Sequence, residues 1–375
     1  MFSEKRFINY TLKIRGLRRK IMLAVFTLTG LGILFVYDVS SVYGWWNYSD
    51  SAYFLKRHCL FIALGIVSMF AALRVNLDFL RRHSKLLAAI ALFLLVLVLV
   101  IGTRAGGARR WFRILGFSIQ PSEFAKIIYI LYAADFLSRK RRHIRSFMVG
   151  IFPLLIVTGL FSGLILMEPD LGNAALICGL MFALLFVSGM PWRYIAGFAG
   201  SGAALLAGLI LTSPYRMARV MSFLDPWADA LGSGFQLAQS NIAVGSGGLL
   251  GVGLGNSMQK LFFLPAIHTD FIFAVIGEEL GFIGSCAVMG LYFFVFTVGL
   301  RLVKTLEEGS FNYYVCVGGV FLYIIEACLN FSVVTGLMPT KGLPLPFISY
   351  GGSATVANFI MLGLLFNAAK ESEYI

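Results

Sequence analysis

Long apolar runs separated by short polar segments dominate the chain, and strict alternation of apolar and polar residues is absent. An apolar run of about 20 residues is long enough to cross a bilayer as a helix, which satisfies its own backbone polar groups there. The pattern therefore predicts an all-α integral membrane protein, a bundle of about ten transmembrane helices rather than a barrel. The predicted helices cover residues 20–37, 57–74, 85–102, 122–137, 147–167, 173–189, 194–212, 270–300, 312–334 and 348–368.

Composition agrees with a membrane location for the whole chain. Hydrophobic residues make up 59% of the 375 positions and charged residues only 13%, whereas soluble domains carry about a quarter charged residues. The five cysteines fall in apolar segments with no C-x-x-C pair, which is typical of small buried side chains. We therefore expect residues 1–375 to form a single polytopic membrane domain.

The basic residues predict the orientation of the bundle. Most of the 31 lysines and arginines fall in the N-terminal segment and in alternate loops, including the run "SRKRRHIR". Because cytoplasmic loops are enriched in these residues, both termini are predicted to be cytoplasmic, with a basic N-terminal segment (1–19) and a tail (369–375). The net charge of +13 then reflects topology and attraction to anionic lipid, and no nucleic-acid partner is expected.

Several cations remain on the predicted outer side, against this preference. Two explanations stay open: they bind an anionic ligand there, or they form salt bridges within the loops. The large loop between the seventh and eighth helices (213–269) is glycine-rich and contains one segment, 233–248, that could form a short amphipathic helix lying on the membrane. The outer cations are Arg104, Arg109, Arg110, Arg113, Arg216, Arg219 and Lys341.

The carboxylates near the eighth predicted helix carry the candidate chemistry. Asp270 stands at its N-terminus, where the helix dipole favours an ionised side chain; it is either a helix cap or a general base. Glu278 and Glu279 follow about 12–14 Å deeper and, like Glu326, are expected to pair structurally or line a polar cavity. His268 is a weak candidate for a metal ligand or a proton partner of Asp270.

A second group of polar residues stands at the start of the fourth predicted helix. Glu123 and Lys126 lie three residues apart in "QPSEFAKI", so they are neighbours on one helix face, and an internal ion pair is the simpler interpretation. "EPDLGNA" (168–174) marks a broken or re-entrant end of the fifth helix because it combines proline, glycine and two acids.

Four long motifs in this order resemble one family. They are "GGARRWFRILGFSIQPSEFAK" (106–126), "EPDLGNA" (168–174), the segment from "GSGFQLAQSNIAVGSGG" to "HTDFIFAVIGEELG" (232–281) and "MPTKGLPLPFISYGGS" (338–353). They are similar to the SEDS proteins (shape, elongation, division and sporulation), which include FtsW and RodA. The motif "PTKG" favours the division branch, FtsW, over RodA.

The resemblance implies a ten-helix fold and peptidoglycan glycosyltransferase activity, in which lipid II is polymerised at the outer face of the bacterial cytoplasmic (inner) membrane. Asp270 matches the catalytic aspartate of the family and is the expected general base, and Glu123 and Lys126 match residues that shape the cavity floor. Outer cations or a divalent ion, Mg²⁺ or Mn²⁺, would neutralise the departing lipid diphosphate. The candidate substrate-binding residues are Arg109, Arg110, Glu123, Lys126, Arg216, Arg219, Gln236, Ser240, His268, Thr269, Lys341 and Ser349; none is assigned as a metal ligand.

The resemblance also implies partners: a class B penicillin-binding protein that cross-links the strands, and other membrane proteins of a division or elongation complex. The sequence departs from common family patterns at Ala266 and Phe262, where relatives often carry acids, and more mildly at Asn173. Three rival functions remain: a lipid II flippase, which would move substrate without chemistry, an ion-coupled transporter that uses Glu278, Glu279 and Glu326, and a structural scaffold.

Overall fold

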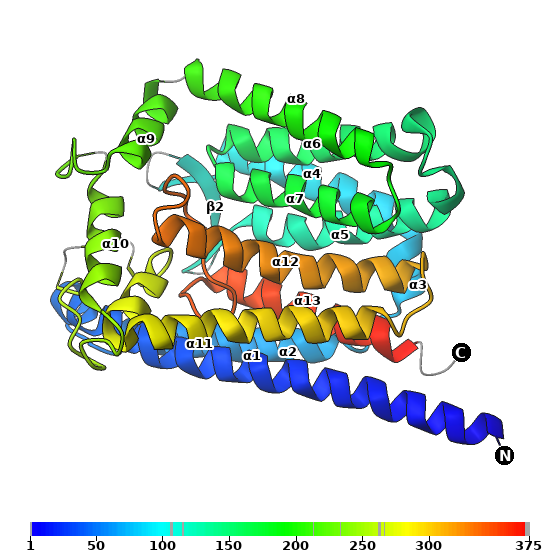
Figure 1. Ribbon diagram of the computed structural model, residues 1–375, viewed down its shortest axis with the longest axis horizontal. Helices are drawn as coiled ribbons and strands as arrows, with labels where there is room; N and C mark the ends of the chain where they lie inside the picture. Colours follow the sequence, from blue (N-terminus) through cyan, green and yellow to red (C-terminus); the bar gives the residue numbers. More distant parts are fainter. Residues whose placement is uncertain are drawn as a thin grey trace.

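The computed structural model describes residues 2–105, 108–114, 116–212, 214–232, 234–261, 264–265 and 267–371. Helices dominate, and the long ones run side by side along the bundle (Figure 1). The α-helices are α1 (Phe2–Tyr48), α2 (Tyr53–Ala72), α3 (Leu77–Arg82), α4 (Ser84–Ile101), α5 (Pro121–Lys140), α6 (Phe152–Met167), α7 (Leu171–Val187), α8 (Trp192–Leu211), α9 (Pro214–Leu224), α10 (Phe235–Ser246), α11 (Ile272–Val303), α12 (Phe311–Val334) and α13 (Gly352–Glu371). A 3₁₀ turn (Arg141–His143) and a π-helical turn (Phe147–Ile151) connect α5 to α6.

Each predicted membrane helix overlaps one helix of the structure, so the all-α membrane class is confirmed. Seven helical segments among the described residues are long and apolar enough to cross a bilayer, and α7 is a shorter apolar helix. The central helix α5 differs because it carries Glu123, Lys126 and Asp135, all buried. The count of ten spans stays a prediction.

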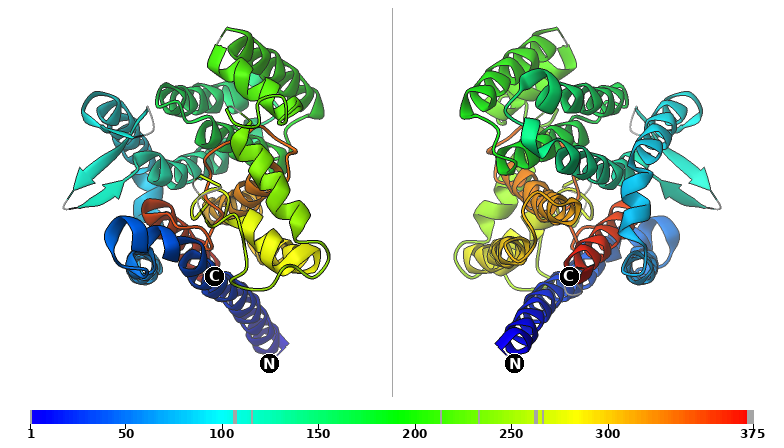
Figure 2. Two further views of the ribbon diagram at one scale, coloured as in Figure 1. Left: turned by 90° about the vertical axis from the view of Figure 1, so that its left-hand side faces the viewer. Right: turned by 90° about the vertical axis from the view of Figure 1, so that its right-hand side faces the viewer.

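Two features differ from the sequence-based expectation. The first helix extends to both sides of the predicted range 20–37, and its N-terminal end projects beyond the other helices (Figure 1). The loop after α4 forms a small antiparallel sheet, β1 (Thr103–Ala105), β2 (Ala108–Ile114) and β3 (Phe117–Ile119), in the order β1-β2-β3. This sheet stands out to one side of the bundle (Figure 2), and it was missed because its strands are too short to show a period of two.

The loop between α8 and α11 contains α9 and α10, and α10 confirms the short helix expected within 233–248. One face of α10 is buried, with Leu237, Ala238 and Ala243 against α11 and α12. The hydroxyl of Ser240 donates to the carbonyl of Val334 at 2.7 Å and ties α10 to the end of α12. That α10 lies on the membrane remains a prediction.

Helix α11 is interrupted at Gly281, whose φ of 67° and ψ of −164° are not helical. Glycine tolerates this conformation because it has no Cβ. The preceding loop bonds the backbone groups at the break: the amides of Val252 and Gly253 donate to the carbonyls of Glu278 and Glu279 at 3.0 and 3.1 Å. The first residues of α11 therefore form a short half-helix joined to the loop 247–253.

The buried carboxylates deeper in the bundle are paired, as the structural interpretation expected. Lys126 donates to Glu123 at 2.7 Å and also to Glu326 of α12. Buried charges are tolerated when paired in this way. This triad joins α5 to α12.

Glu278 and Glu279 hold the loop 257–260 against α11. The amide of Met258 donates to Glu278 at 3.0 Å, and that of Ser257 donates to Glu279 at 3.1 Å. Lys260 then bridges Glu279, at 3.5 Å, and Asp38 of α1, at 2.9 Å. These carboxylates connect α11 to a loop and to α1.

Candidate active site

A cavity of about 190 Å³ opens between the sheet, the N-terminal ends of α5 and α7 and the loop before α13. Asp270 lies in its wall, in the turn that precedes α11. The cavity collects residues from four separate sequence motifs, which only the folded chain brings together. Its lining is Arg110, Trp111, Gln120, Glu123, Asp170, Asn173, Thr269, Asp270, Gly342, Pro344, Tyr350, Gly351, Gly352, Ser353 and Ala354.

Asp270 is held by its backbone rather than by a capping bond. Helix α11 starts at Ile272 with Phe271 as its N-cap and no side-chain capping bond. Of the two alternatives left open for Asp270, the helix cap is therefore wrong. Asn330 of α12 donates to the Asp270 carbonyl at 2.8 Å. A Cβ at Gly342 would lie 2.9 Å from Oδ2 of Asp270, so the glycine leaves room for the carboxylate.

The environment of Asp270 favours its protonated form. Burial raises its pKa to about 7, helped by the negative charge of Asp170, while Arg110 and a hydrogen bond from Thr269 lower it. Removing a carboxylate from water disfavours its charged form. The sequence analysis expected the helix N-terminus to favour the ionised form, but burial in the cavity wall raises the pKa to about 7 instead.

A second carboxylate, Asp170, lines the same cavity in a hydrogen-bonded setting. It is the N-cap of α7: its Oδ1 accepts from the Asn173 amide at 3.0 Å. Its Oδ2 accepts from the side chains of Asn173, at 3.0 Å, and Gln120, at 3.3 Å. Asn173, which departs from the common family residue, thus supplies two of the bonds that fix Asp170.

Arg110 is the one cationic side chain in the lining given above for this cavity. Its Nε and Nη2 donate to the backbone carbonyls of Glu168 and Pro169 at 2.7 and 2.6 Å. The Glu168 carboxyl is fully buried, and burial raises its pKa to about 8, so it is largely protonated at neutral pH. The charge of Arg110 is therefore not cancelled by this neighbour.

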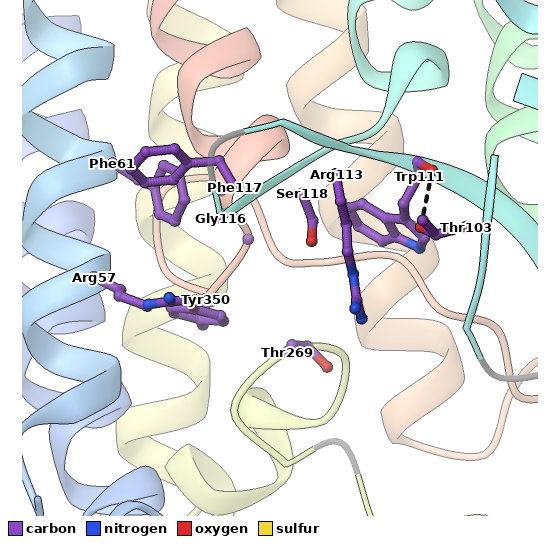
Figure 3. A pocket seen from close by; sticks show the side chains of 12 residues that line it. Arg57, Phe61, Thr103, Trp111, Arg113, Gly116, Phe117, Ser118, Thr269 and Tyr350 are labelled. Atoms are coloured by element: carbon purple, nitrogen blue, oxygen red, sulfur yellow. Dashed lines mark hydrogen bonds between the residues drawn. The ribbon is translucent and has the colours of Figure 1, made fainter. Parts of the chain in front are cut away.

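A second cavity, of about 340 Å³, shares the wall made by Trp111, Thr269, Tyr350, Gly351 and Gly352 with the first. Figure 3 shows Arg113 pointing from β2 toward Thr269, and Arg57 of α2 beside Tyr350. A hydrogen bond and the positive charge of Arg57 partly counter the rise that burial causes in the Tyr350 pKa. The shared wall places two more arginines next to the Asp270 cavity.

The remaining predicted residues lie in different places. Glu123 lines the Asp270 cavity, and Lys126 contacts Glu123 at 2.7 Å. Burial lowers the pKa of Lys341, and the negative charge of Asp170 partly offsets this fall. Arg109 instead donates to the Val100 carbonyl at 2.7 Å, at the end of α4. Among the predicted residues whose side chains the structure describes, those that line neither cavity are Arg109, Lys126, Gln236, Ser240, His268, Lys341 and Ser349; their contact with substrate stays a prediction.

Several of those residues have structural contacts. Ser349 accepts from the Leu345 amide at 2.9 Å. The His268 ring packs between Phe54 and Tyr350, and burial lowers its pKa to about 4. Arg216 and Arg219 belong to α9, but their side chains lie outside the described residues, as do Phe262 and Ala266.

The candidate list from the sequence omitted several residues of the two cavities, among them Arg57, Trp111, Gln120, Asp170 and Tyr350. All of these except Arg57 stand inside the quoted motifs, which was the available signal. Arg57 gave none, because it lies at the edge of an ordinary predicted membrane helix.

A divalent cation would find few protein ligands here. Within the described ranges, no group of three or more His, Cys, Asp or Glu side chains could hold a metal ion. Asp170 and Asp270 share one cavity, and Mg²⁺ often binds through one or two carboxylates together with substrate phosphates and water. The residues therefore fit an ion that arrives with a phosphorylated substrate.

The chain is similar to proteins of one family along almost its whole length. The cell cycle protein family that groups FtsW, RodA and SpoVE matches residues 19–374. The probable peptidoglycan glycosyltransferase FtsW of Trichlorobacter lovleyi is 41% identical over 349 residues, 92% of this chain and 91% of that protein. Stage V sporulation protein E of Bacillus subtilis is 41% identical over 360 residues, 94% of this chain and 98% of that protein.

Solved structures agree with the sequence relatives. A chain from the study "Structural coordination of polymerization and crosslinking by a peptidoglycan synthase complex" superposes with a TM-score of 0.78 at 30% identity, covering 94% of this chain and 97% of that one. The rod shape determining protein RodA of Thermus thermophilus superposes with a TM-score of 0.69 at 27% identity, covering 94% and 96%. This chain belongs to the FtsW, RodA and SpoVE family of cell cycle proteins.

Proposed function

We propose that the protein is a peptidoglycan glycosyltransferase that polymerises lipid II, with Asp270 as general base. The observation that carries this proposal is the Asp270 cavity: a carboxylate with a pKa raised to about 7 faces Arg110 and Asp170. A base works best when its pKa lies near the working pH. The family relatives named as probable glycosyltransferases support the same reaction.

In the proposed reaction, Asp270 takes the proton from the sugar 4-hydroxyl of the acceptor as that oxygen attacks C1 of the donor. The new C1–O bond forms while the bond from C1 to the lipid diphosphate breaks, and the diphosphate leaves with both electrons. Because negative charge grows on this leaving group, cations beside it would lower the barrier. Arg110 lies in the Asp270 cavity, and Arg57 and Arg113 lie in the adjoining one.

A divalent ion is a further proposed source of positive charge. When bound, Mg²⁺ or Mn²⁺ would offset the charge on the diphosphate oxygens. Asp170 is the carboxylate in the cavity that would hold it, because Asp270 is assigned the acceptor proton. Hydrogen bonds from the side chains of Asn173 and Gln120 fix the orientation of the Asp170 carboxylate.

We further propose that the Asp270 cavity faces the periplasm or cell exterior, in a protein of the bacterial cytoplasmic membrane. The lysine and arginine distribution supports this orientation. The expected partners are lipid II, a class B penicillin-binding protein and other complex members. Ser257 and Lys260 have the S-x-x-K spacing of serine transpeptidases, but they are bound to Glu278 and Asp38, so cross-linking requires a partner enzyme.

The test is polymerisation of labelled lipid II by the purified protein, with and without its transpeptidase and a divalent ion. Wild type is expected to form glycan ladders, and Asp270→Asn to form none while remaining folded. Asp50→Asn is the matched control, because this acid lines neither cavity and contacts Lys56 at 2.7 Å and the Ala52 amide at 3.0 Å. Ladders from Asp270→Asn would refute its role as the base. Lipid II movement across vesicles without any polymer, in both proteins, would favour the flippase instead.

A further inference from the structure

A third cavity, of about 430 Å³, lies at the other end of α5 from the Asp270 site. Its wall includes Asp135 and Arg139, which follow the start of α5 by 14 residues or more, a distance of about 20 Å along the helix. The cavity is therefore separate from the proposed catalytic site. Arg81, Arg82 and Lys85 complete a lining in which four cationic side chains face two carboxylates.

Asp135 organises one side of this cavity. It is buried and accepts bonds from the Ser84 hydroxyl at 2.7 Å and from Arg139 at 2.8 and 3.0 Å, with Arg81 at 3.7 Å. These contacts join α3, α4 and α5. Asp135 therefore has no free capacity to neutralise further cations, and its role is to hold Arg139 and Arg81 in place.

Two cations of the cavity remain without a counter-charge. Neither Arg82 nor Lys85 forms a hydrogen bond or ion pair through its side chain with any other residue that the structure describes. The second carboxylate, Asp78, is exposed and pairs with neither. The cavity thus has a surplus of positive charge with free donor groups, which is the chemistry that binds phosphate.

An apolar surface on α4 follows Lys85, one of the cationic residues that line the cavity. Along α4, Leu86, Ile90 and Phe93 are 57%, 45% and 63% exposed, and they recur at the spacing of one helix face. This helix is one of the candidate membrane spans, so the exposed face is suited to contact acyl chains. A cationic cavity that continues into such a face fits an amphiphile better than a free anion.

We propose that this cavity binds the headgroup phosphate of an anionic glycerophospholipid, with its acyl chains along α4. Arg82 and Lys85 contact the phosphate, while Asp135 positions Arg139 and Arg81 around it. The site is independent of the proposed glycosyltransferase reaction. It would anchor the junction of α3, α4 and α5 to the anionic leaflet that attracts basic segments.

The test is lipid binding by the full chain in neutral detergent, measured by native mass spectrometry with added phosphatidylglycerol, phosphatidylcholine or inorganic phosphate. Arg82→Gln with Lys85→Gln is expected to weaken phosphatidylglycerol binding roughly tenfold, since each basic residue near an anionic surface contributes measurably. The matched control is Arg142→Gln with Arg145→Gln, two exposed arginines outside the cavity, which should leave binding unchanged.

Three results would overturn the proposal. Equal losses from both variant pairs would show general charge attraction without a site. Equal binding of phosphatidylcholine would remove the role of the anionic headgroup. Inorganic phosphate that displaces phosphatidylglycerol at equal concentration would show that the acyl chains contribute nothing. An unchanged thermal midpoint in both variant pairs is the check that the fold is intact.

Discussion

Asn330 donates from its side-chain amide to the backbone carbonyl of Asp270 at 2.8 Å, and to that of Leu343 at 2.8 Å. One side chain on α12 therefore joins the turn that carries the proposed base to the loop before α13, which also lines the cavity. Asn330 lies near the Asp270 cavity without lining it, so its role is to position the two segments.

Asn330→Leu should reduce the turnover of lipid II more than it reduces stability. The loss of a buried amide leaves two carbonyls without a donor, which costs about 1–3 kcal/mol, and it releases the turn that holds Asp270. Asn367→Leu is the matched control because Asn367 also donates to two carbonyls, those of Ala72 and Val75, far from the cavity. Thermal unfolding and polymerisation rates of both variants check this. Equal loss of activity in the two would contradict a positioning role.

Gly342→Ala should lower activity with little effect on folding. The new methyl group would lie 2.9 Å from Oδ2 of Asp270, so the carboxylate must move, whereas the rest of the wall need not. Gly290→Ala, at a position with no atom within 4 Å, is the control. The measurement is the polymerisation rate at saturating lipid II. Wild-type turnover in Gly342→Ala would show that the orientation of Asp270 is not critical.

Polymerisation should depend on pH through the ionisation of Asp270. Its pKa is raised to about 7, and a general base acts only when deprotonated. Activity should therefore fall as the pH drops through about 7 and level off above it. Asn173→Ala, which removes an amide donor from Asp170, should shift this midpoint. Rates across a pH series for both proteins test the assignment, and an unchanged rate at pH 5 would exclude Asp270 as the base.

Lys126→Met should destabilise the protein strongly. Lys126 bonds to both Glu123 and Glu326, and removing the cation leaves two buried carboxylates uncompensated, a change that typically costs about 3–5 kcal/mol. Lys126→Met combined with Glu123→Gln and Glu326→Gln should recover part of the loss. The measurement is the thermal unfolding midpoint, in detergent, of wild type, the single variant and the triple variant. A Lys126→Met protein as stable as wild type would mean that water reaches the triad.

Most helices of the bundle were predictable because seven of the described ones are apolar runs of span length. The pairing of Glu326 followed from the cost of burying a lone charge. The sheet at 103–119 could not be predicted, because strands of three to seven residues are too short to show a clear alternation of apolar and polar residues. The start of α11 was placed two residues early, because Asp270 looks like a cap in sequence while the fold places it in a cavity wall.

The site was only partly predictable, because segments far apart along the chain form it. Asp270, Glu123, Arg110 and Thr269 were named as candidates, and the structure brings them to one cavity. Arg57 and Tyr350 join the adjoining cavity through contacts between α2 and the loop before α13. No local pattern encodes contacts between segments so far apart along the chain.

The break at Gly281 makes helix α11 and the loop 247–253 a single inseparable unit. The Phe282 amide donates to the Gly248 carbonyl at 2.9 Å, and a Cβ on Gly251 would lie 2.0 Å from the Glu279 carbonyl oxygen. A chimaera that exchanges this loop between relatives without the matching part of α11 would expose unpaired peptide groups. Recombination within the family should therefore succeed only when residues 247–283 are transferred as one block.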